Sequence, residues 1–330
     1  MTVPTGGHID DEGVEVENGG RGGDGRIPVG VVGTGGMGGM HAHCLHRKVA
    51  GARVAAVSDV DAQRAGKVAE ECGAAVFGDA VEMIRADGVA AVVIASPDPT
   101  HAELVHECLR LGKPVLCEKP LATSPEEALG IVEAEVEASR KLVQVGFMRR
   151  YDPQHVDVKN VVLSGAIGEP VLFKGWHRNA QSPPGADSGW VVINAAIHDL
   201  DSARWMLDAE VEEVFIRGLN TNGSGRGEFD LQLIQLLFAD GRLATIEVNV
   251  DAGFGYEVGA EVVGVSGTAY TAPPSGATVR LDRGFTQKVD GDWLDRFEPA
   301  YTIELQEWVG SIEDGRPPSI DRAHSCSSMV

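Results

Sequence analysis

A glycine-rich motif near the N-terminal end of the chain is the first feature that could bind a ligand. It has the form GxGxxG and consists of Gly33, Thr34, Gly35, Gly36, Met37 and Gly38. An aliphatic run, residues 27–32, precedes the motif, and a stretch with helical character follows it. In this context the backbone amides of the loop and the N-terminus of the helix can hold a pyrophosphate. Because glycine is abundant in this chain, the context rather than the motif alone indicates a nucleotide site.

An aspartate at the end of the next aliphatic run indicates which nucleotide binds. Asp59 lies about 20 residues beyond the glycine motif, a spacing at which a carboxylate accepts hydrogen bonds from the adenosine ribose hydroxyls. A carboxylate in that place repels the 2′-phosphate of NADP. The sequence therefore predicts NAD as the cofactor. The alternative is a tight structural turn followed by an aspartate that caps a helix.

A lysine and a histidine could carry out proton chemistry beside such a nucleotide. Lys119 ends a parallel strand, at the edge where open α/β sheets bind ligands, and its ammonium group could stabilise alkoxide character on a reacting oxygen. His198 lies in an expected helix that follows a polar loop, and it is a natural acid or base. Taken singly, these residues are as readily a surface lysine and a core or capping histidine.

A cluster of possible metal ligands lies on the helix after the glycine motif. It contains His41, His43, Cys44 and His46. His41 and His43 would point to different faces of that helix, and no acidic ligand partners are evident. We therefore expect no bound metal.

Short aliphatic runs alternate with amphipathic stretches in the first half of the chain. The runs cover residues 27–32, 53–58, 89–95, 115–117 and 142–147. The helical patterns between them cover residues 62–72, 100–111 and 125–140. Continuous aliphatic strands that alternate with helices are typical of a parallel sheet covered on both faces. We predict an α/β fold in which residues 27–147 form an NAD-binding Rossmann domain with a doubly wound parallel sheet.

The second half of the chain has a different pattern. Helices are expected at residues 153–164, 194–207 and 301–312, with a strand at 171–177 and a polar loop at 180–189. Longer alternating segments follow at residues 211–219, 228–238, 242–251 and 257–265, and Asp240-Gly241 is a hairpin turn signal. Residues 148–330 should therefore form an α+β domain with a large, mostly antiparallel open sheet. The uncovered face of such a sheet predicts a homo-oligomer.

Composition and charge exclude several functions. The chain has 330 residues, enough for two domains, and 28 basic residues against 49 acidic ones give a net charge of −21. Such a surface repels nucleic acids and anionic membranes. No apolar run approaches the ~18 residues of a membrane span, and residues 1–26 lack the apolar core of a secretory signal. We therefore expect a cytoplasmic protein without nucleic-acid or membrane partners.

The N-terminal residues and the cysteines allow two further predictions. Residues 1–26 are rich in glycine and acids and are expected to form a disordered tail. The cysteines are odd in number and contain no CxxC pair, which argues against disulfides and structural zinc. Four of them, Cys44, Cys72, Cys108 and Cys117, lie in apolar or helical stretches and should be buried thiols.

Four motifs in order resemble a known family. Cys117-Glu118-Lys119-Pro120-Leu121 looks like the signature of the glucose–fructose oxidoreductase/inositol dehydrogenase (Gfo/Idh/MocA) family. The segment GFMRRYDP at residues 146–153, His177-Arg178-Asn179, and His198-Asp199-Leu200-Asp201 followed by Arg204-Trp205 are similar to its inositol 2-dehydrogenase branch. The resemblance extends from residue 27 to about residue 318.

This resemblance implies an NAD-dependent oxidoreductase that transfers hydride between a secondary alcohol of a cyclitol and nicotinamide, giving a keto-cyclitol. It implies catalytic positions at Lys119, His198 and Asn194. It places near the cofactor, besides the glycine motif and Asp59, residues Ser96, Pro97, His101, Glu118 and Lys119. It places near the substrate Lys119, Met148, Arg149, His177, Asn179, Asn194, His198 and Tyr256. His101 could instead be an ordinary first-turn helix residue and Tyr256 a sheet-face aromatic. A homotetramer or homodimer is implied.

The sequence departs from the family pattern at two places. Asn194 stands where the motif has an aspartate, four residues before His198 and so on the same helical face. An amide can orient a hydroxyl but cannot carry a proton. Three outcomes follow: Lys119 and His198 act alone, the substrate is an altered cyclitol or aminocyclitol, or activity is low. The end of the chain, residues 322–330, is short and polar, so a last packing element is expected to be abbreviated.

Two other functions remain open at this stage. A dehydrogenase or ketoreductase of pyranoses or nucleotide sugars would share most of these motifs, although no extra basic cluster near residues 180–189 suggests a diphosphate pocket. A non-catalytic NAD-binding sensor is consistent with Asn194. Retention of both Lys119 and His198 argues against a sensor.

Overall fold

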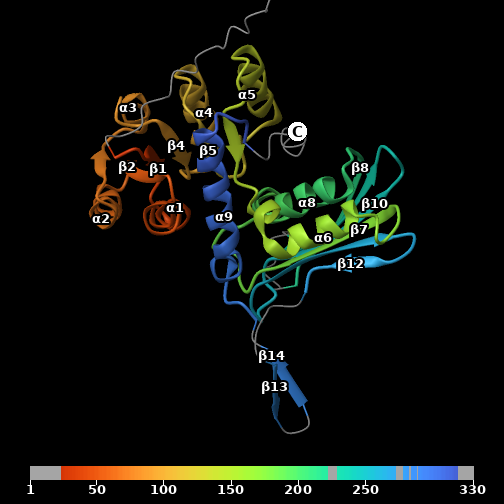
Figure 1. Ribbon diagram of the computed structural model, residues 1–330. Helices are drawn as coiled ribbons and strands as arrows, with labels where there is room; N and C mark the ends of the chain where they lie inside the picture. The colour runs from red at the N-terminus through yellow and green to blue at the C-terminus, as the bar shows by residue number, and fades with distance from the viewer. Residues whose placement is uncertain (1–23, 222–228, 273–277, 282–283, 288, 319–330) are drawn as a thin grey trace, which may run out of the picture.

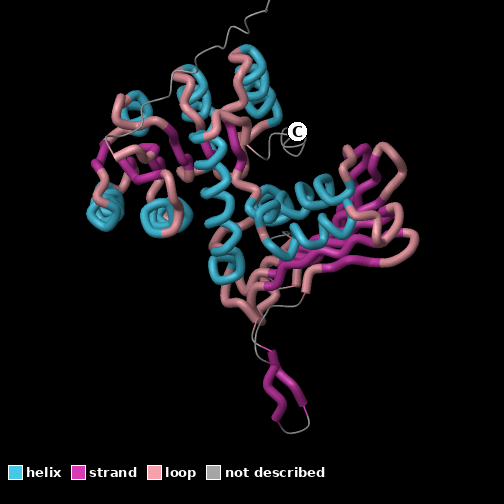
Figure 2. Tube along the Cα trace, viewed as in Figure 1, coloured by secondary structure: helices cyan, strands magenta, loops and turns pink. Residues whose placement is uncertain are grey.

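A computed structural model describes residues 24–221, 229–272, 278–281, 284–287 and 289–318. Two sheets lie side by side, each covered by helices, and a long C-terminal helix runs between them (Figures 1 and 2). The predictions about the tail at residues 1–23, the end of the chain beyond residue 318 and Cys326 lie outside the described residues. None of the described helices is long and apolar enough to cross a membrane.

The first sheet has six parallel strands in the order β3-β2-β1-β4-β5-β6. The strands are β1 (Ile27–Val32), β2 (Ala52–Ser58), β3 (Ala75–Phe77), β4 (Ala91–Ile94), β5 (Val115–Cys117) and β6 (Val143–Val145). The order of the strands reverses between β1 and β4, so a crevice opens at their carboxyl ends, where such sheets bind ligands. The predicted α/β fold class is confirmed.

Helices cover both faces of this sheet. On one face lie α1 (Gly36–Arg47), α2 (Ala62–Cys72) and the C-terminal part of α9 (Trp293–Glu313). On the other lie α3 (Ala80–Arg85), α4 (His101–Arg110) and α5 (Pro125–Glu137). The sequence analysis missed β3 and α3 because both are short, and the mostly exposed edge strand β3 has no continuous buried run.

The second sheet has the order β12-β11-β7-β10-β9-β8. Its strands are β7 (Pro170–Arg178), β8 (Val211–Leu219), β9 (Leu231–Phe238), β10 (Leu243–Asn249), β11 (Glu257–Gly264) and β12 (Thr268–Tyr270). All neighbouring pairs are antiparallel except β7 and β10, which are parallel. Gly241, with φ of 86°, makes the predicted hairpin turn between β9 and β10. A separate hairpin, β13 (Thr278–Leu281) and β14 (Gly284–Gln287), follows the sheet.

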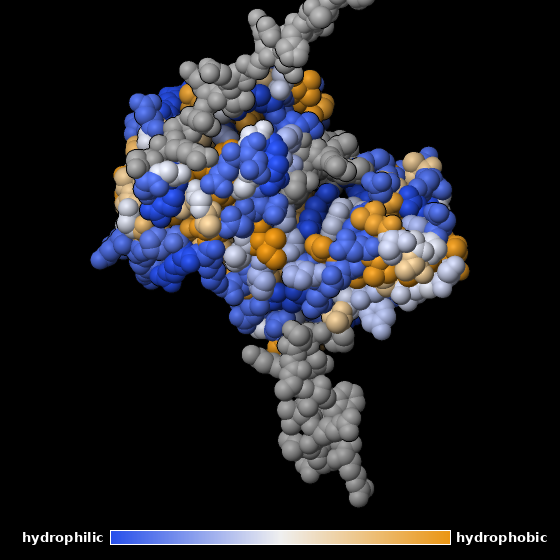
Figure 3. Space-filling model, viewed as in Figure 1, coloured by the Kyte–Doolittle hydropathy of each residue, from blue (hydrophilic) through white to orange (hydrophobic). Residues whose placement is uncertain are grey.

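Helices cover one face of the second sheet and leave the other open (Figure 1). The covering helices are α6 (Pro153–Leu163) and α8 (Ile197–Leu207). Strand register places Phe215, Leu219, Leu233, Leu243 and Tyr270 on the open face, where each is at least 47% exposed. On the side of the molecule that Figure 3 shows, hydrophobic residues are scattered among polar ones on the second domain.

Two helices differ from the sequence prediction in ways that matter for the site. The helix expected from residue 194 begins earlier, with α7 (Ser188–Trp190) and the wide π-helical turn η3 (Val191–Ala196), before α8. Helix α9 begins at Trp293 rather than at residue 301 and contains Pro299. The Asp292 carboxylate accepts hydrogen bonds from the amides of Leu294 and Asp295, so this side chain sets the helix start.

Helix α9 joins the two lobes. Its first half packs Phe297, Ala300 and Tyr301 against Met148 and Tyr256, while its second half buries Trp308 under the first sheet. The four described cysteines are free and buried, as predicted. The cavity described next lies where these elements meet.

Candidate active site between the two sheets

A cavity of about 840 Å³ lies between the carboxyl ends of the first sheet and the inner side of the second domain. The first sheet contributes loops after β1, β4 and β5, and the second domain contributes β7, the turn η3, helix α8 and the start of α9. Predicted site residues that line it are Met37, Ser96, His101, Glu118, Lys119, Met148, His177, Asn179, Asn194, His198 and Tyr256. The tertiary structure therefore gathers most of the predicted side chains around one space.

The glycine loop between β1 and α1 has room for a pyrophosphate. Gly33 has φ of 80°, and a Cβ on Gly38 would lie 1.8 Å from the carbonyl oxygen of Gly33, so both must be glycine. Around Gly35 and Gly36, in contrast, no described atom lies within 4 Å of a built Cβ. Gly35 is the N-cap of α1 and supplies no capping side chain, which leaves the first amides of the helix for a ligand. The loop thus fits the phosphates of a dinucleotide.

Asp59 lies at the carboxyl end of β2, beside this loop. Its Oδ2 accepts hydrogen bonds from the amide and hydroxyl of Thr34, at 2.6 and 2.9 Å. Arg64, in the first turn of α2, donates to both carboxylate oxygens. Burial acts to raise the pKa of Asp59, but these hydrogen bonds outweigh it and hold the pKa below its ordinary value. Asp59 is therefore ionised, as binding of ribose hydroxyls requires.

His101 connects two loops at the carboxyl ends of β4 and β5. Its Nδ1 lies 2.6 Å from the carbonyl oxygen of Pro120, and its Nε2 lies 2.8 Å from that of Ser96. The buried ring thus ties the loop after β4 to the cis Lys119–Pro120 peptide after β5. Pro97, which precedes the short helix η1 (Asp98–Thr100), does not line the cavity.

The histidines of α1 have acidic partners, which the sequence analysis did not find. His41 Nε2 lies 2.6 Å from Glu118 Oε1, and both side chains are buried. His43 instead pairs with Glu71 of α2. The two histidines are directed to separate carboxylates, and the described residues contain no group of three or more potential metal ligands.

Lys119 and His198 lie together in a buried part of the cavity. Lys119 Nζ lies 3.3 Å from Asn194 Oδ1, and burial lowers the pKa of the ammonium group. Burial, and next the charge of Lys119, lower the pKa of His198 well below its ordinary value. His198 Nδ1 has no hydrogen-bond partner among the described residues. His198 is therefore an uncharged imidazole at neutral pH, able to accept a proton.

Arg149 is buried and is not among the residues that line the cavity. Its side chain is 1% exposed, with Nη1 2.7 Å from Asp199 Oδ1 and Nη2 3.1 Å from His177 Nδ1. A buried guanidinium needs a carboxylate partner, because an unpaired buried charge is strongly destabilising. Arg149 thus orients His177, which does line the cavity, rather than reaching it directly.

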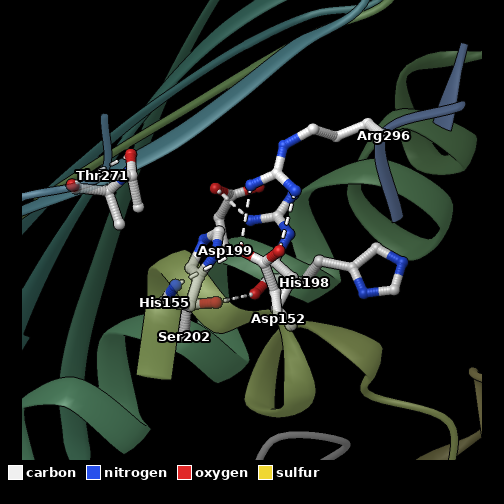
Figure 4. Close-up of polar contacts among 9 residues, drawn as sticks. Asp152, His155, His198, Asp199, Ser202, Thr271 and Arg296 are labelled. Atoms are coloured by element: carbon white, nitrogen blue, oxygen red, sulfur yellow. Dashed lines mark hydrogen bonds and ion pairs between the residues drawn. The ribbon is translucent and has the colours of Figure 1, made fainter. Parts of the chain in front are cut away.

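A second buried network supports this region. Arg296 of α9 donates two hydrogen bonds to Asp152, at 2.8 and 2.9 Å, and Asp152 also contacts His155 of α6 (Figure 4). Burial acts to raise the pKa of Asp152, but His155 and Arg296 hold it below its ordinary value. This ion pair fixes the start of α9 against the second domain.

Several cavity residues were not found from the sequence. They are Asp98, Trp190, Asp292, Trp293 and Tyr301. Trp293 and Tyr301 lie on α9, far along the chain from the motif that ends at Trp205, and no local spacing connects them with the site. The Asp199 side chain, which does not line the cavity, was visible only as part of the HxxD motif.

Comparisons with known proteins agree with this geometry. The family model described as oxidoreductase family, NAD-binding Rossmann fold (GFO/IDH/MocA) matches residues 27–147, and the GFO/IDH/MocA C-terminal domain model matches residues 155–270. Inositol 2-dehydrogenase of Rubrobacter xylanophilus is 61% identical over 300 residues, which cover 91% of this chain and 86% of that protein.

Solved structures show the same arrangement of domains. Myo-inositol dehydrogenase of Lactobacillus casei, in complex with NAD(H) and myo-inositol, matches with a TM-score of 0.88 and 31% identity over 92% of each chain. Scyllo-inositol dehydrogenase of the same organism, with NAD(H) and scyllo-inositol, matches with a TM-score of 0.85 and 26% identity, covering 92% of this chain and 94% of that one.

Proposed function

Because this chain belongs to the GFO/IDH/MocA oxidoreductase family, we propose that it is an NAD-dependent dehydrogenase that oxidises a secondary hydroxyl of an inositol to the keto-cyclitol. The observation that carries the proposal is the meeting of Lys119 and His198 in one cavity with the glycine loop. The names of its relatives, inositol 2-dehydrogenase and myo-inositol dehydrogenase, support a cyclitol as the substrate.

We assign a separate role in this reaction to each of several cavity residues. Bound NAD supplies the hydride acceptor. Lys119 donates a hydrogen bond to the reacting oxygen and stabilises its developing negative charge. His198, uncharged, accepts the hydroxyl proton as the C–H bond gives up its hydride. His177, Asn179 and Tyr256 are assigned to the remaining ring hydroxyls.

A cyclitol bearing an amino group is the second candidate. Asn194 replaces the carboxylate of the family motif, while Asp98 and Asp292 place other carboxylates on the cavity wall. An ammonium substituent would find counter-charges there. Equal or better turnover of plain myo-inositol than of any amino- or keto-cyclitol would rule this candidate out and leave inositol as the substrate.

The open face of the second sheet is proposed as the contact between copies of this chain, in a homodimer or homotetramer. Its exposed apolar side chains support this proposal. We place the enzyme in the cytoplasm, where an NAD-linked oxidation has its cofactor pool.

The test is NADH formation, followed by absorbance, with purified protein and a panel of inositol isomers, aminocyclitols and aldoses. NAD and NADP are run in parallel. We expect cyclitol-dependent reduction of NAD, reduced about 10³-fold or more in Lys119→Ala. Lys67→Ala removes an exposed lysine of α2 and should leave the rate unchanged. Turnover of aldoses alone would favour the sugar enzyme, and NAD binding without any turnover would favour the sensor.

A further inference from the structure

The carboxylate that should bind the adenosine ribose is already filled by donors of the protein itself. Asp59 Oδ2 accepts from the Thr34 amide, the Thr34 hydroxyl and Arg64 Nε. Asp59 Oδ1 accepts from the Asp61 amide at 2.8 Å and from Arg64 Nη2 at 2.6 Å. A carboxylate offers about four acceptor positions. No lone pair therefore remains for a ribose hydroxyl, and the Asp59 side chain is only 3% exposed.

One of these donors must leave when a dinucleotide binds. The amides of Thr34 and Asp61 belong to the backbone of the glycine loop and of the turn that begins α2, so they cannot withdraw without local unfolding. Arg64 is different because its side chain is 45% exposed and belongs to a flexible stem in the first turn of α2. After its departure three donors remain for about four positions, and the free position lies on Oδ1, where it can accept a ribose hydroxyl.

We propose that Arg64 is a displaceable cap on the Asp59 carboxylate. Arg64 and the adenosine ribose compete for this carboxylate, and their competition sets the affinity for the cofactor. The inference rests on the proposed function because it takes NAD as the ligand. Every molecule of NAD that binds must first break a bidentate, charge-assisted pair. Arg64 therefore weakens NAD binding, although it lies beside the nucleotide site.

The displaced guanidinium also affects the choice between NAD and NADP. Asp59 repels a 2′-phosphate, but a cation within reach of the same position attracts it. Arg64 therefore reduces the discrimination that Asp59 provides. Its removal should strengthen the binding of NAD and weaken the binding of NADP, two changes of opposite sign from one substitution.

The test measures binding without turnover. Dissociation constants of NADH and NADPH are obtained from nucleotide fluorescence for the wild type, Arg64→Ala and Arg64→Met, the second of which keeps an apolar stem. We expect Kd for NADH to fall by about threefold to tenfold and Kd for NADPH to rise by a similar factor. Lys67→Ala is the control. Lys67 is an exposed lysine on the same helix, and no contact joins it to Asp59 among the described residues.

Unchanged Kd values for both nucleotides, or weaker NADH binding in both Arg64 variants with melting temperatures like the wild type, would overturn the cap. Weaker NADH binding would mean that Arg64 helps to hold the nucleotide. Failure of the proposed function is seen separately, as wild-type protein that binds NADH but reduces no NAD with any cyclitol.

Discussion

At the scale of single residues, Asn194 changes the electrostatics around Lys119 and His198, the proposed catalytic pair. Its amide oxygen contacts Lys119 but carries no charge to balance the ammonium group. Burial lowers the pKa of His198, and the positive charges of Lys119 and Arg149 oppose its protonation further. His198 therefore stays uncharged across the physiological pH range. Its low pKa also means that it binds an accepted proton weakly.

Asn194→Asp should make kcat/KM fall at acidic pH. A carboxylate beside Lys119 and His198 stabilises their charged forms and raises both pKa values. In the wild type, His198 is unprotonated around pH 6, so kcat/KM should not fall there through this group. In Asn194→Asp, kcat/KM for myo-inositol should fall as pH decreases through about 6.5. Steady-state rates between pH 5 and 9 check this.

Asn179→Asp is the control for Asn194→Asp, because it adds the same charge to another part of the cavity wall. If both variants shift the profile equally, general charge rather than the position of residue 194 controls His198. If neither shifts it, His198 is not the titrating base.

At the scale of elements, α9 contains a buried carboxyl group that the catalytic steps do not use. Glu304 is fully buried, and neither of its oxygens has a partner among the described residues. Burial, and next the charge of Glu118, raise its pKa well above the ordinary value. The folded protein therefore holds this group protonated, while the unfolded chain ionises it above about pH 4.3.

Glu304→Leu should stabilise the protein more at high pH than at low pH. A raised pKa in the folded state means that stability is fully present below the unfolded pKa and is lost as pH rises toward the folded one. The loss is about 1.4 kcal/mol per pH unit within that window. Thermal melts at pH 5 and pH 8 should thus show a larger gain for the variant at pH 8.

The matched control is Glu307→Leu, one turn away on the same helix, whose side chain is half exposed. Its effect should not depend on pH between 5 and 8. A gain for Glu304→Leu that is equal at both pH values would show that Glu304 does not change its protonation on unfolding.

At the scale of the whole molecule, the two lobes differ in how their sheets are covered. The first sheet has helices on both faces, and α9 and the Arg296–Asp152 pair connect it to the second. The second sheet has one open face, on which apolar side chains alternate with charged ones such as Arg217. A second copy of the chain is the partner that the proposal assigns to this face.

Leu233→Arg should separate the copies. The new charge would lie within the open face, beside Glu247 of the same chain, and a second copy packed on this face would have to desolvate it. Sedimentation velocity should show a smaller particle than the wild type, with an unchanged melting onset at low concentration. Val60→Arg, at a fully exposed position of the first domain, is the control and should not alter the sedimentation. A monomeric wild type would contradict the assignment of this face.

The sequence by itself determined the fold class, the family and the cofactor. Each rests on local signals: strand and helix periodicity, a glycine loop directly after a strand, an aspartate after the next strand and the Glu118-Lys119-Pro120 motif. Such signals are read within a few turns of one element, where backbone geometry and burial repeat regularly. The hairpin turn at Asp240-Gly241 was readable for the same reason.

Only the tertiary structure decided which side chains meet. Arg149 does not line the cavity because its buried partners, Asp199 and His177, come from distant elements. The contribution of α9 to the site depends on a cap at Asp292 and on packing across both lobes. The ion pair between Arg64 and Asp59 depends on the geometry of the turn between β2 and α2. Ion pairs and burial couple residues through space, and periodicity along the chain carries no information about those distances.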